Sequence, residues 1–309
     1  MSRIFIAIII SLCYTNFMIG IIVVNAYIQK QTELNQAFRI QEELGKLNIQ
    51  TKIVYTNEIA VFISSGNFNC NFKHIDFCIY LDKDKHILQM LKKLNIKIFN
   101  NVKAIEICDD KLLTHIALAQ SDIPMPKTIG GVLCYYPQAK VQENILQIAE
   151  NELGYPMIIK ECYGSLGKGI YLINNKDELN EIAEKVKLKP HLFQQFIKES
   201  SGKDIRVIVI GGKCVGGMLR QNSADFRSNI EVGGKGYPTT LTQEQIDLCE
   251  RVSKILNLDY CGIDLLIDKH GKPLVCEVNS NAFFRTFEQI TNINVAKLYA
   301  EHIKNSLAK

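Results

Sequence analysis

Short apolar runs rich in β-branched residues alternate with amphipathic segments over the first hundred residues of this 309-residue chain. Two segments, 31–48 and 84–94, place their apolar residues at helical spacing. Strands that alternate with helices along a chain build a parallel sheet with helices on its faces. The pattern therefore predicts a doubly wound α/β unit over residues 18–103. Its predicted strands are 20–25, 49–55, 75–81 and 96–99.

The pattern changes after residue 102, where helices are followed by pairs of strands. A strand meander begins at residue 204, and two further runs, 260–267 and 273–279, read as a hairpin. Helices packed on mixed sheets predict an α+β body behind the α/β unit. The other predicted elements are helices 102–121, 141–153, 176–186, 242–256 and one from about 294, with strands 156–161, 169–173 and 191–198.

The N-terminus contains 21 consecutive residues without a charge, Ile4–Val24. By length this stretch could be a membrane-spanning helix, and by position a signal peptide. A third interpretation splits it, so that 20–25 is the first buried strand and 1–17 is an extension or lies upstream of a start at Met18. We favour the split because the α/β unit needs a first strand here. The chain is then cytoplasmic, with membrane contact only if residues 1–24 are an anchor.

Composition excludes several classes of protein. The 36 basic and 32 acidic residues are mixed along the chain and give a net charge of +4, so no nucleic-acid partner is predicted. The ten cysteines have no C-x-x-C spacing and lie mostly in apolar runs, which is typical of reduced cysteines in a cytosolic core. The six histidines form no H-x-x-x-H pair, which argues against zinc.

A glycine-rich turn, Gly-Ser-Leu-Gly-Lys-Gly at 164–169, joins two predicted strands. It is not a P-loop, because Gly169 stands where that motif needs Ser or Thr and the turn does not open a helix. Three glycines in six residues still allow backbone N–H groups to approach an anion closely. Lys160, just upstream, could reach the same anion as a point charge. The alternative is an ordinary glycine-rich hairpin beside a solvated lysine.

Three polar residues interrupt the apolar strands of the predicted hairpin at 260–279. Glu277 and Asn279 share one face of their strand, and Asp264 lies near-opposite on the neighbouring strand. Two buried carboxylates repel one another unless a cation lies between them. Two carboxylates and an amide oxygen suit magnesium. The alternative is a solvent-facing sheet surface with ordinary alternation.

Arginines mark the meander: Arg206 and Arg220 lie on its strands, and Arg227 follows them. Arginine side chains match the geometry of carboxylates and phosphates, although single arginines on a sheet surface are common. Together with the glycine turn and the polar hairpin, they predict a metal–nucleotide site that lacks a P-loop.

These stretches resemble the ATP-grasp ligases, and specifically the RimK-type branch of glutamate and amino-acid ligases. The resemblance covers residues 100–300 well and 18–100 only in the βα pattern. It implies an ATP-grasp fold with an N-terminal Rossmann-like (pre-ATP-grasp) domain at 18–103, a central subdomain at 104–193 and a C-terminal subdomain at 194–309. The matching motifs are DDKLLT, IPMPKT, PMIIKECYGSLGKGI, FQQFIKESSGKDIRVIVIGGK, LRQNSADFRSNIEVGGK and GIDLLID with PLVCEVNS.

The resemblance also implies which residues bind ATP. The turn would fold over the phosphates as a lid, and a hinge would read adenine through its backbone. The implied residues are Lys111 and Lys160 for the phosphates, Gly164, Ser165, Gly167 and Gly169 for the lid, Gln195 and Phe196 for the hinge, Asp204 for the ribose, and Arg227, Ser228 and Asn229 for the nucleotide and acyl-phosphate end.

The same resemblance implies the metal and catalytic residues. Asp264 and Glu277 would bind one magnesium ion, and Glu277 and Asn279 a second, with manganese as a substitute. Arg220, together with Arg206, would stabilise charge on the transferred phosphoryl group or the tetrahedral intermediate.

The implied activity is an ATP-dependent carboxylate–amine ligase that forms an amide through an acyl phosphate. Its partners would be ATP, an amino acid (glutamate first) and a carboxylate acceptor on a peptide, protein or small molecule; a homo-oligomer is an open expectation. Two alternatives are a LysX-like ligase acting on the amino group of a carrier protein or metabolite, and a non-catalytic nucleotide-binding module. The chain departs from the family pattern at Leu166, at the Gln195–Phe196 hinge, and at 281–285, where the amino substrate should approach.

Overall fold

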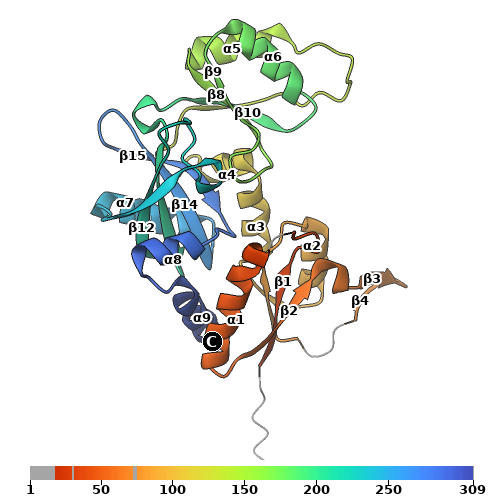
Figure 1. Cartoon of the computed structure of the whole chain (residues 1–309). Helices are drawn as coiled ribbons and strands as arrows, with labels where there is room; N and C mark the ends of the chain where they lie inside the picture. Colours follow the sequence, from red (N-terminus) through yellow and green to blue (C-terminus); the bar gives the residue numbers. More distant parts are fainter. Residues whose placement is uncertain (1–17, 30, 72–74, 309) are drawn as a thin grey trace, which may run out of the picture.

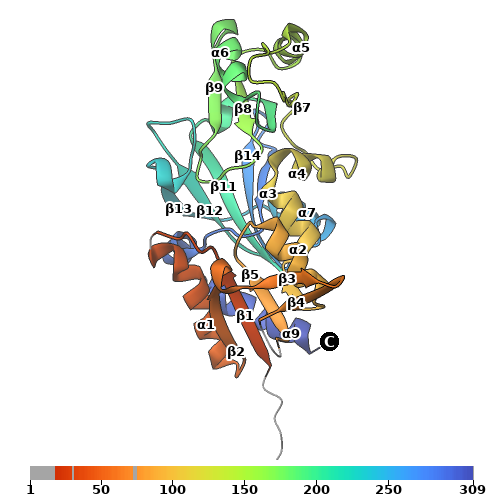
Figure 2. The same cartoon turned by 90° about the vertical axis from the view of Figure 1, so that its right-hand side faces the viewer.

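The computed structural model describes residues 18–29, 31–71 and 75–308. The predictions for residues 1–17 lie outside the described residues. The chain forms three units, each built on its own sheet, with the C-terminal sheet between the other two along the long direction of the molecule (Figures 1 and 2). No helix among the described residues is long and apolar enough to cross a membrane.

The N-terminal unit is a four-stranded parallel sheet in the order β2-β1-β5-β6, with helices on both faces. Alternate residues of β1 face opposite cores. Ile22 and Val24 pack with α1, whereas Ile21 and Val23 pack with α2 and α3. The predicted doubly wound arrangement and its first strand are confirmed. The elements are β1 (Ile19–Val24), α1 (Asn35–Lys46), β2 (Gln50–Tyr55), β5 (Phe77–Tyr80), α2 (Lys85–Lys93) and β6 (Lys97–Phe99).

A small antiparallel hairpin, β3 (Val61–Ser64) and β4 (Asn67–Cys70), extends from this unit (Figure 1). The sequence pattern did not predict it, because its short strands carry mixed polar and apolar residues. The described residues also form short 3-10 helices of three or four residues: Gln31–Leu34, Thr56–Glu58, Lys198–Ser200 and Ile230–Val232.

The single helix predicted at 102–121 is wrong in one respect, because it is broken into α3 (Val102–Asp109) and α4 (Lys111–Leu118). Asp110 has an extended backbone between them and caps α4. Its Oδ1 accepts hydrogen bonds from the backbone N–H groups of Leu112 at 2.9 Å and Leu113 at 3.0 Å. The break makes Lys111 the first residue of α4 and directs it toward the site.

The central unit is a four-stranded antiparallel sheet in the order β7-β10-β8-β9, covered by two helices. Strand β10 ends at Gln195, three residues earlier than predicted, and β7 was not predicted. The elements are β7 (Thr128–Gly130), α5 (Glu143–Leu153), β8 (Met157–Glu161), β9 (Ile170–Ile173), α6 (Lys176–Val186) and β10 (His191–Gln195).

The C-terminal unit is a five-stranded antiparallel sheet in the order β13-β12-β11-β14-β15. The predicted meander and hairpin are confirmed, whereas β13 and α8 were missed. The elements are β11 (Lys203–Ile210), β12 (Lys213–Gln221), β13 (Lys235–Thr239), α7 (Gln243–Ile255), β14 (Tyr260–Ile267), β15 (Pro273–Asn279), α8 (Arg285–Thr291) and α9 (Val295–Leu307).

The last helix joins the first and last units. Helix α9 lies beside α1 (Figure 1), and the two helices share a core with the inner faces of β1 and β5. The N-terminal unit is thereby packed against the C-terminal unit, so the carboxyl ends of its parallel strands lie next to the polar hairpin β14–β15. The domain boundaries at 103/104 and 193/194 stay predictions.

Candidate active site

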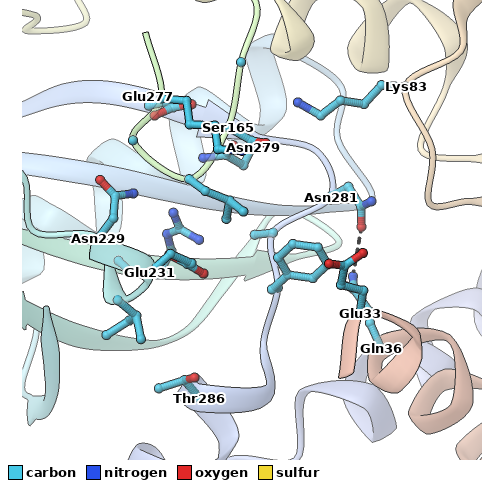
Figure 3. A pocket seen from close by; sticks show the side chains of 18 of the residues that line it. Glu33, Gln36, Lys83, Ser165, Asn229, Glu231, Glu277, Asn279, Asn281 and Thr286 are labelled. Atoms are coloured by element: carbon cyan, nitrogen blue, oxygen red, sulfur yellow. Dashed lines mark hydrogen bonds between the residues drawn. The ribbon is translucent and has the colours of Figure 1, made fainter. Parts of the chain in front are cut away.

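Two adjoining cavities lie where the three units meet. The larger, of about 420 Å³, is lined by the glycine turn, the C-terminal sheet and the loops after β1 and β5 (Figure 3). The smaller, of about 90 Å³, lies between the central and C-terminal sheets. Arg220, Asn229 and Glu277 line both cavities, so the two meet at these side chains. Clefts outside the carboxyl ends of parallel strands are common ligand sites.

The floor of the site is a row of alternating charges across the C-terminal sheet. The register places Asp204 opposite Arg220, and Arg206 opposite Asp264, which in turn lies opposite Glu277. Directly opposed side chains on one face are close enough to pair. The alternation therefore builds a buried network of carboxylates and guanidinium groups.

The contacts in this network are close. Arg220 donates from Nε to Asp204 Oδ1 at 2.7 Å, and its Nη2 lies 2.8 Å from Asp264 Oδ2. Arg206 binds both oxygens of Asp264, with Nη2 to Oδ2 at 2.8 Å. Two bidentate guanidinium contacts are the strongest form of ion pairing available to these side chains.

The two aspartates of the network have opposite pKa shifts. Burial acts to raise the pKa of Asp264, but the charges of Arg206 and Arg220 outweigh burial and lower it. Burial raises the pKa of Asp204, and the nearby Asp264 adds to this, against the opposing charge of Arg220. Asp264 is therefore the more firmly ionised of the two carboxylates.

The predicted metal ligands lie together at the meeting point of the cavities. Asp264 and Glu277 are paired across β14 and β15, and Glu277 and Asn279 lie near each other beside the turn residue Ser165 (Figure 3). This donor set of two carboxylates and an amide oxygen suits magnesium. Since no group of three His, Cys, Asp or Glu side chains in the described part of the chain could hold a metal, the amide of Asn279 is needed.

Asp264 is not a free ligand, because both of its oxygens contact arginine. Glu277 is more open, with a side chain 25% exposed, and its nearest cation is Lys111 at 3.7 Å. A magnesium ion would therefore take Glu277 and Asn279 most easily and share Asp264 with the guanidinium groups. This arrangement was not foreseen from the sequence.

Lys160 is another buried cation of the site, and it has no carboxylate partner in the described structure. Its side chain extends from β8 into the wall of the smaller cavity, and the residue is 7% exposed. Its Nζ donates to Cys276 Sγ at 3.4 Å, a weak acceptor. A buried ammonium group without an anion is costly. The position therefore suits a phosphate group of ATP.

The glycine turn is held over the larger cavity by two side chains. Lys111 donates from Nζ to the carbonyl oxygen of Gly164 at 2.9 Å, and Arg227 donates from Nη1 to that of Gly167 at 2.8 Å. Gly167 has a φ of +76°, and a Cβ there would lie 3.2 Å from Asn229 Oδ1. Any residue with a side chain would be strained at position 167, so the local backbone conformation explains why a glycine stands there.

The remaining predicted residues occupy the edges of the site. Gln195 and Phe196 line the smaller cavity, as the hinge prediction requires. Ser228 is buried in the same wall and hydrogen-bonds Asp204. Gly169 lines neither cavity; its carbonyl oxygen accepts from the backbone N–H of Glu161 at 2.8 Å and closes the base of the turn.

Sequence reasoning missed the contribution of the N-terminal unit. Glu33, Gln36, Asp82 and Lys83 line the larger cavity, and Figure 3 shows Glu33, Gln36 and Lys83 on the side opposite Asn229. Asp82 and Lys83 follow the buried strand β5, so their place at its carboxyl end was a usable signal. Arg285, which opens the unpredicted helix α8, was missed as well.

Comparisons with known proteins show which family the chain belongs to. Residues 108–303 match the RimK-like ATP-grasp domain. The chain is 37% identical over 293 residues to N-acetylaspartylglutamate synthase A of Homo sapiens, covering 90% of this chain and 73% of that protein. It is 35% identical over 232 residues to beta-citrylglutamate synthase B of Homo sapiens, covering 73% and 58%.

A solved structure shares the fold. The ATP-grasp ligase PsnB, in complex with a variant of its minimal precursor, Mg and ADP, has a TM-score of 0.67 at 16% identity, covering 95% of this chain and 99% of that chain. The chain belongs to the RimK-like ATP-grasp family. It is therefore an ATP-grasp ligase, and ligases of this class use ATP and magnesium. The predicted family, mixed α/β fold and enzyme class are confirmed.

Proposed function

We propose that the chain joins the amino group of an amino acid, glutamate first, to a carboxylate of a small acid or peptide. The observation that carries the proposal is the pairing of two sites at Glu277. On one side lies the buried Lys160, which pairs with no described carboxylate, and on the other lies the larger cavity of about 420 Å³. Glutamate is favoured because both relatives are named for glutamate conjugates of small acids.

The smaller cavity, together with the adjoining part of the larger one, is assigned to the nucleotide. Gln195 and Phe196 would face the base, and Lys160 and Lys111 would bind phosphate oxygens. Lys111 already bridges the turn and Glu277, so phosphate binding there would couple the turn to the metal ligands. Closing the turn would keep water from the reacting groups.

The metal ligands are assigned to Asp264, Glu277 and Asn279, with two ions as the fuller proposal. When bound, magnesium would neutralise charge on the transferred phosphoryl group. Arg220 and Arg206 would hold Asp264 ionised and in place. A carboxylate is a poor electrophile, so phosphorylation to an acyl phosphate would give it a good leaving group before the amine attacks.

The test is ADP release by the full chain with ATP, magnesium, single amino acids and a pool of acids that includes N-acetyl-L-aspartate, citrate and glutamyl peptides. We expect release that depends on one amino acid and one acid together. Glu277→Ala should lower turnover at least about 100-fold, because the residue would serve both metal positions. Glu244→Ala is the matched control, since Glu244 pairs with Lys272 on the surface, outside both cavities.

Near-normal turnover by Glu277→Ala would contradict the metal assignment. Release with amines other than amino acids would favour the LysX-like alternative. A wild-type chain that binds ATP without releasing ADP for any pair would contradict the proposed reaction with these substrates.

A further inference from the structure

The larger cavity is lined by six cationic side chains, and four of them are already paired. Lys83 binds Asp109 at 2.9 Å, Lys111 lies 3.7 Å from Glu277, and Arg206 and Arg220 hold the buried aspartates. The other two are Lys168, in the glycine turn, and Arg285, the first residue of α8. The side chains of these two form no hydrogen bond or ion pair with any described residue.

Arg285 opens helix α8 directly after a turn, residues 281–284, that is fixed at its start by three hydrogen bonds. Asn281 donates from Nδ2 to the carbonyl oxygen of Leu81 at 2.8 Å and accepts from Gln36 Nε2 at 3.1 Å (Figure 3). The hydroxyl of Tyr260 donates to the carbonyl oxygen of Ala282 at 2.6 Å. The turn is therefore bonded to both the N-terminal and the C-terminal units.

The far end of the turn is fixed by apolar packing. Phe284 and Phe287 flank Arg285 and are fully buried, and helix α8 packs against β12 and β13. With both phenylalanines in the core, Arg285 is left on the exposed side of the helix, where it lines the cavity. A guanidinium group carried by so rigid an element is well suited to select a ligand.

Two other carboxylates of the larger cavity form no ion pair with Arg285. Glu33 and Glu231 line the same cavity, but neither forms an ion pair with any described cation. The cavity thus presents an unpaired guanidinium group together with unpaired carboxylates. A ligand that carries its own carboxylate, and an amino group besides, would complement both kinds of charge.

We propose that Arg285 is a specificity-determining residue that binds a substrate carboxylate not consumed in the reaction. This inference rests on the proposed function and deepens it. Two sources share this chemistry: a carboxylate of the amino-acid substrate, or a second carboxylate of the acid substrate. Either source makes the enzyme select for an extra negative charge on one substrate.

The experiment compares the full chain with Arg285→Gln, Arg285→Lys and the control Lys269→Gln, which removes a charge from the exposed β14–β15 turn outside both cavities. Steady-state KM values are measured for L-glutamate, for the best acid and for ATP. Arg285→Gln should raise the KM of one carboxylate substrate about 10- to 100-fold, while the KM of ATP stays unchanged. Arg285→Lys should raise the same KM less than Arg285→Gln does, because lysine keeps the positive charge but lacks the paired N–H donors of the guanidinium group.

A binding experiment separates the two sources and does not need turnover. Calorimetric titrations with a non-hydrolysable ATP analogue and magnesium compare L-glutamate with L-glutamine, and N-acetyl-L-aspartate with N-acetyl-L-asparagine. The wild-type chain should prefer the carboxylate in one of these pairs, and Arg285→Gln should lose that preference. The pair affected identifies the source.

Equal discrimination by the wild type and Arg285→Gln, or no binding of either carboxylate probe, would overturn the proposal. Unchanged KM values in an active Arg285→Gln enzyme would overturn it too, and would leave the proposed function standing. If the wild type releases no ADP, the proposed function fails, and the titrations alone decide the role of Arg285.

Discussion

Arg220 and Lys160 are buried cations of one site with opposite surroundings. Arg220 is 5% exposed and lies between two carboxylates, whereas Lys160 is 7% exposed and its one side-chain hydrogen bond among the described residues is to a thiol. Both line the smaller cavity. The two side chains are buried to a similar degree and line the same cavity. They therefore differ in whether the protein supplies an opposite charge to the buried cation.

The difference separates a charge that holds the fold from one that awaits a ligand. The network around Arg220 is satisfied within the protein, so removing one member leaves a buried charge without its partner. The ammonium group of Lys160 lacks that compensation, so a phosphate group would supply what the protein does not. The same chemistry thus predicts opposite effects of removing each cation.

The largest effect should come from Arg220→Met. Asp264 would then keep only Arg206, Asp204 would lose its guanidinium partner, and the free energy of unfolding should fall by about 3–5 kcal/mol. Chemical denaturation with urea measures this loss. A fall of less than about 1 kcal/mol would mean that the network is not what holds this sheet together.

Lys160→Met should do the reverse. The free energy of unfolding should stay equal or rise, because an uncompensated ammonium group is replaced by an apolar side chain of similar length. Affinity for ATP with magnesium should fall about 30- to 100-fold, or 2–3 kcal/mol, since a charged hydrogen bond to phosphate is lost.

The control for this variant is Lys127→Met, which removes a lysine paired with Glu152 on the surface. It should leave nucleotide affinity unchanged. An unchanged affinity in Lys160→Met, measured by calorimetry, would count against the phosphate role and would remove the contrast with Arg220.

The polar hairpin could be predicted from the sequence because each of its polar residues interrupts an apolar strand. That pattern placed Asp264 near Glu277, and the register pairs them. The partners of Asp264 could not be predicted in the same way. They depend on β11 lying between β12 and β14, and strand order is a property of the whole sheet.

Three other features of the structure could not be predicted from the sequence pattern. The break between α3 and α4 interrupts an apolar period that continues on both sides, and only the capping aspartate, Asp110, signals it. Helix α8 is too short to show a period, so Arg285 had no predicted element to carry it. The lack of an ion pair between Lys160 and any described carboxylate likewise cannot be predicted from sequence, because it depends on the three-dimensional arrangement.

The smallest effect concerns His115, a neighbour of the uncompensated lysine. It is buried, and burial, with the charge of Lys160 second, lowers its pKa to about 4. Its ring nitrogens lie 3.2 Å from Met125 Sδ and 3.2 Å from Gln194 Nε2, contacts that suit a neutral imidazole.

The sign of the pH effect follows from this shift. In the unfolded chain the ordinary pKa of histidine is about 6.5, so between pH 6.5 and pH 4 the unfolded state binds the proton first. Stability supplied by neutral His115 is therefore complete above pH 6.5 and is lost as the pH falls toward 4. The loss from pH 7 to pH 5 should be about 1–2 kcal/mol.

His115→Gln should flatten the dependence of the unfolding free energy on pH in this window, whatever its effect at pH 7. His86→Gln, an exposed histidine on α2, is the control and should leave the slope unchanged. The sharper form of the test adds Lys160→Met, because removing that charge should raise the pKa of His115 toward its unfolded value, so that the loss of stability on acidification becomes smaller and ends at a higher pH. A slope in His115→Gln equal to that of the wild type would show that His115 is not the group being protonated.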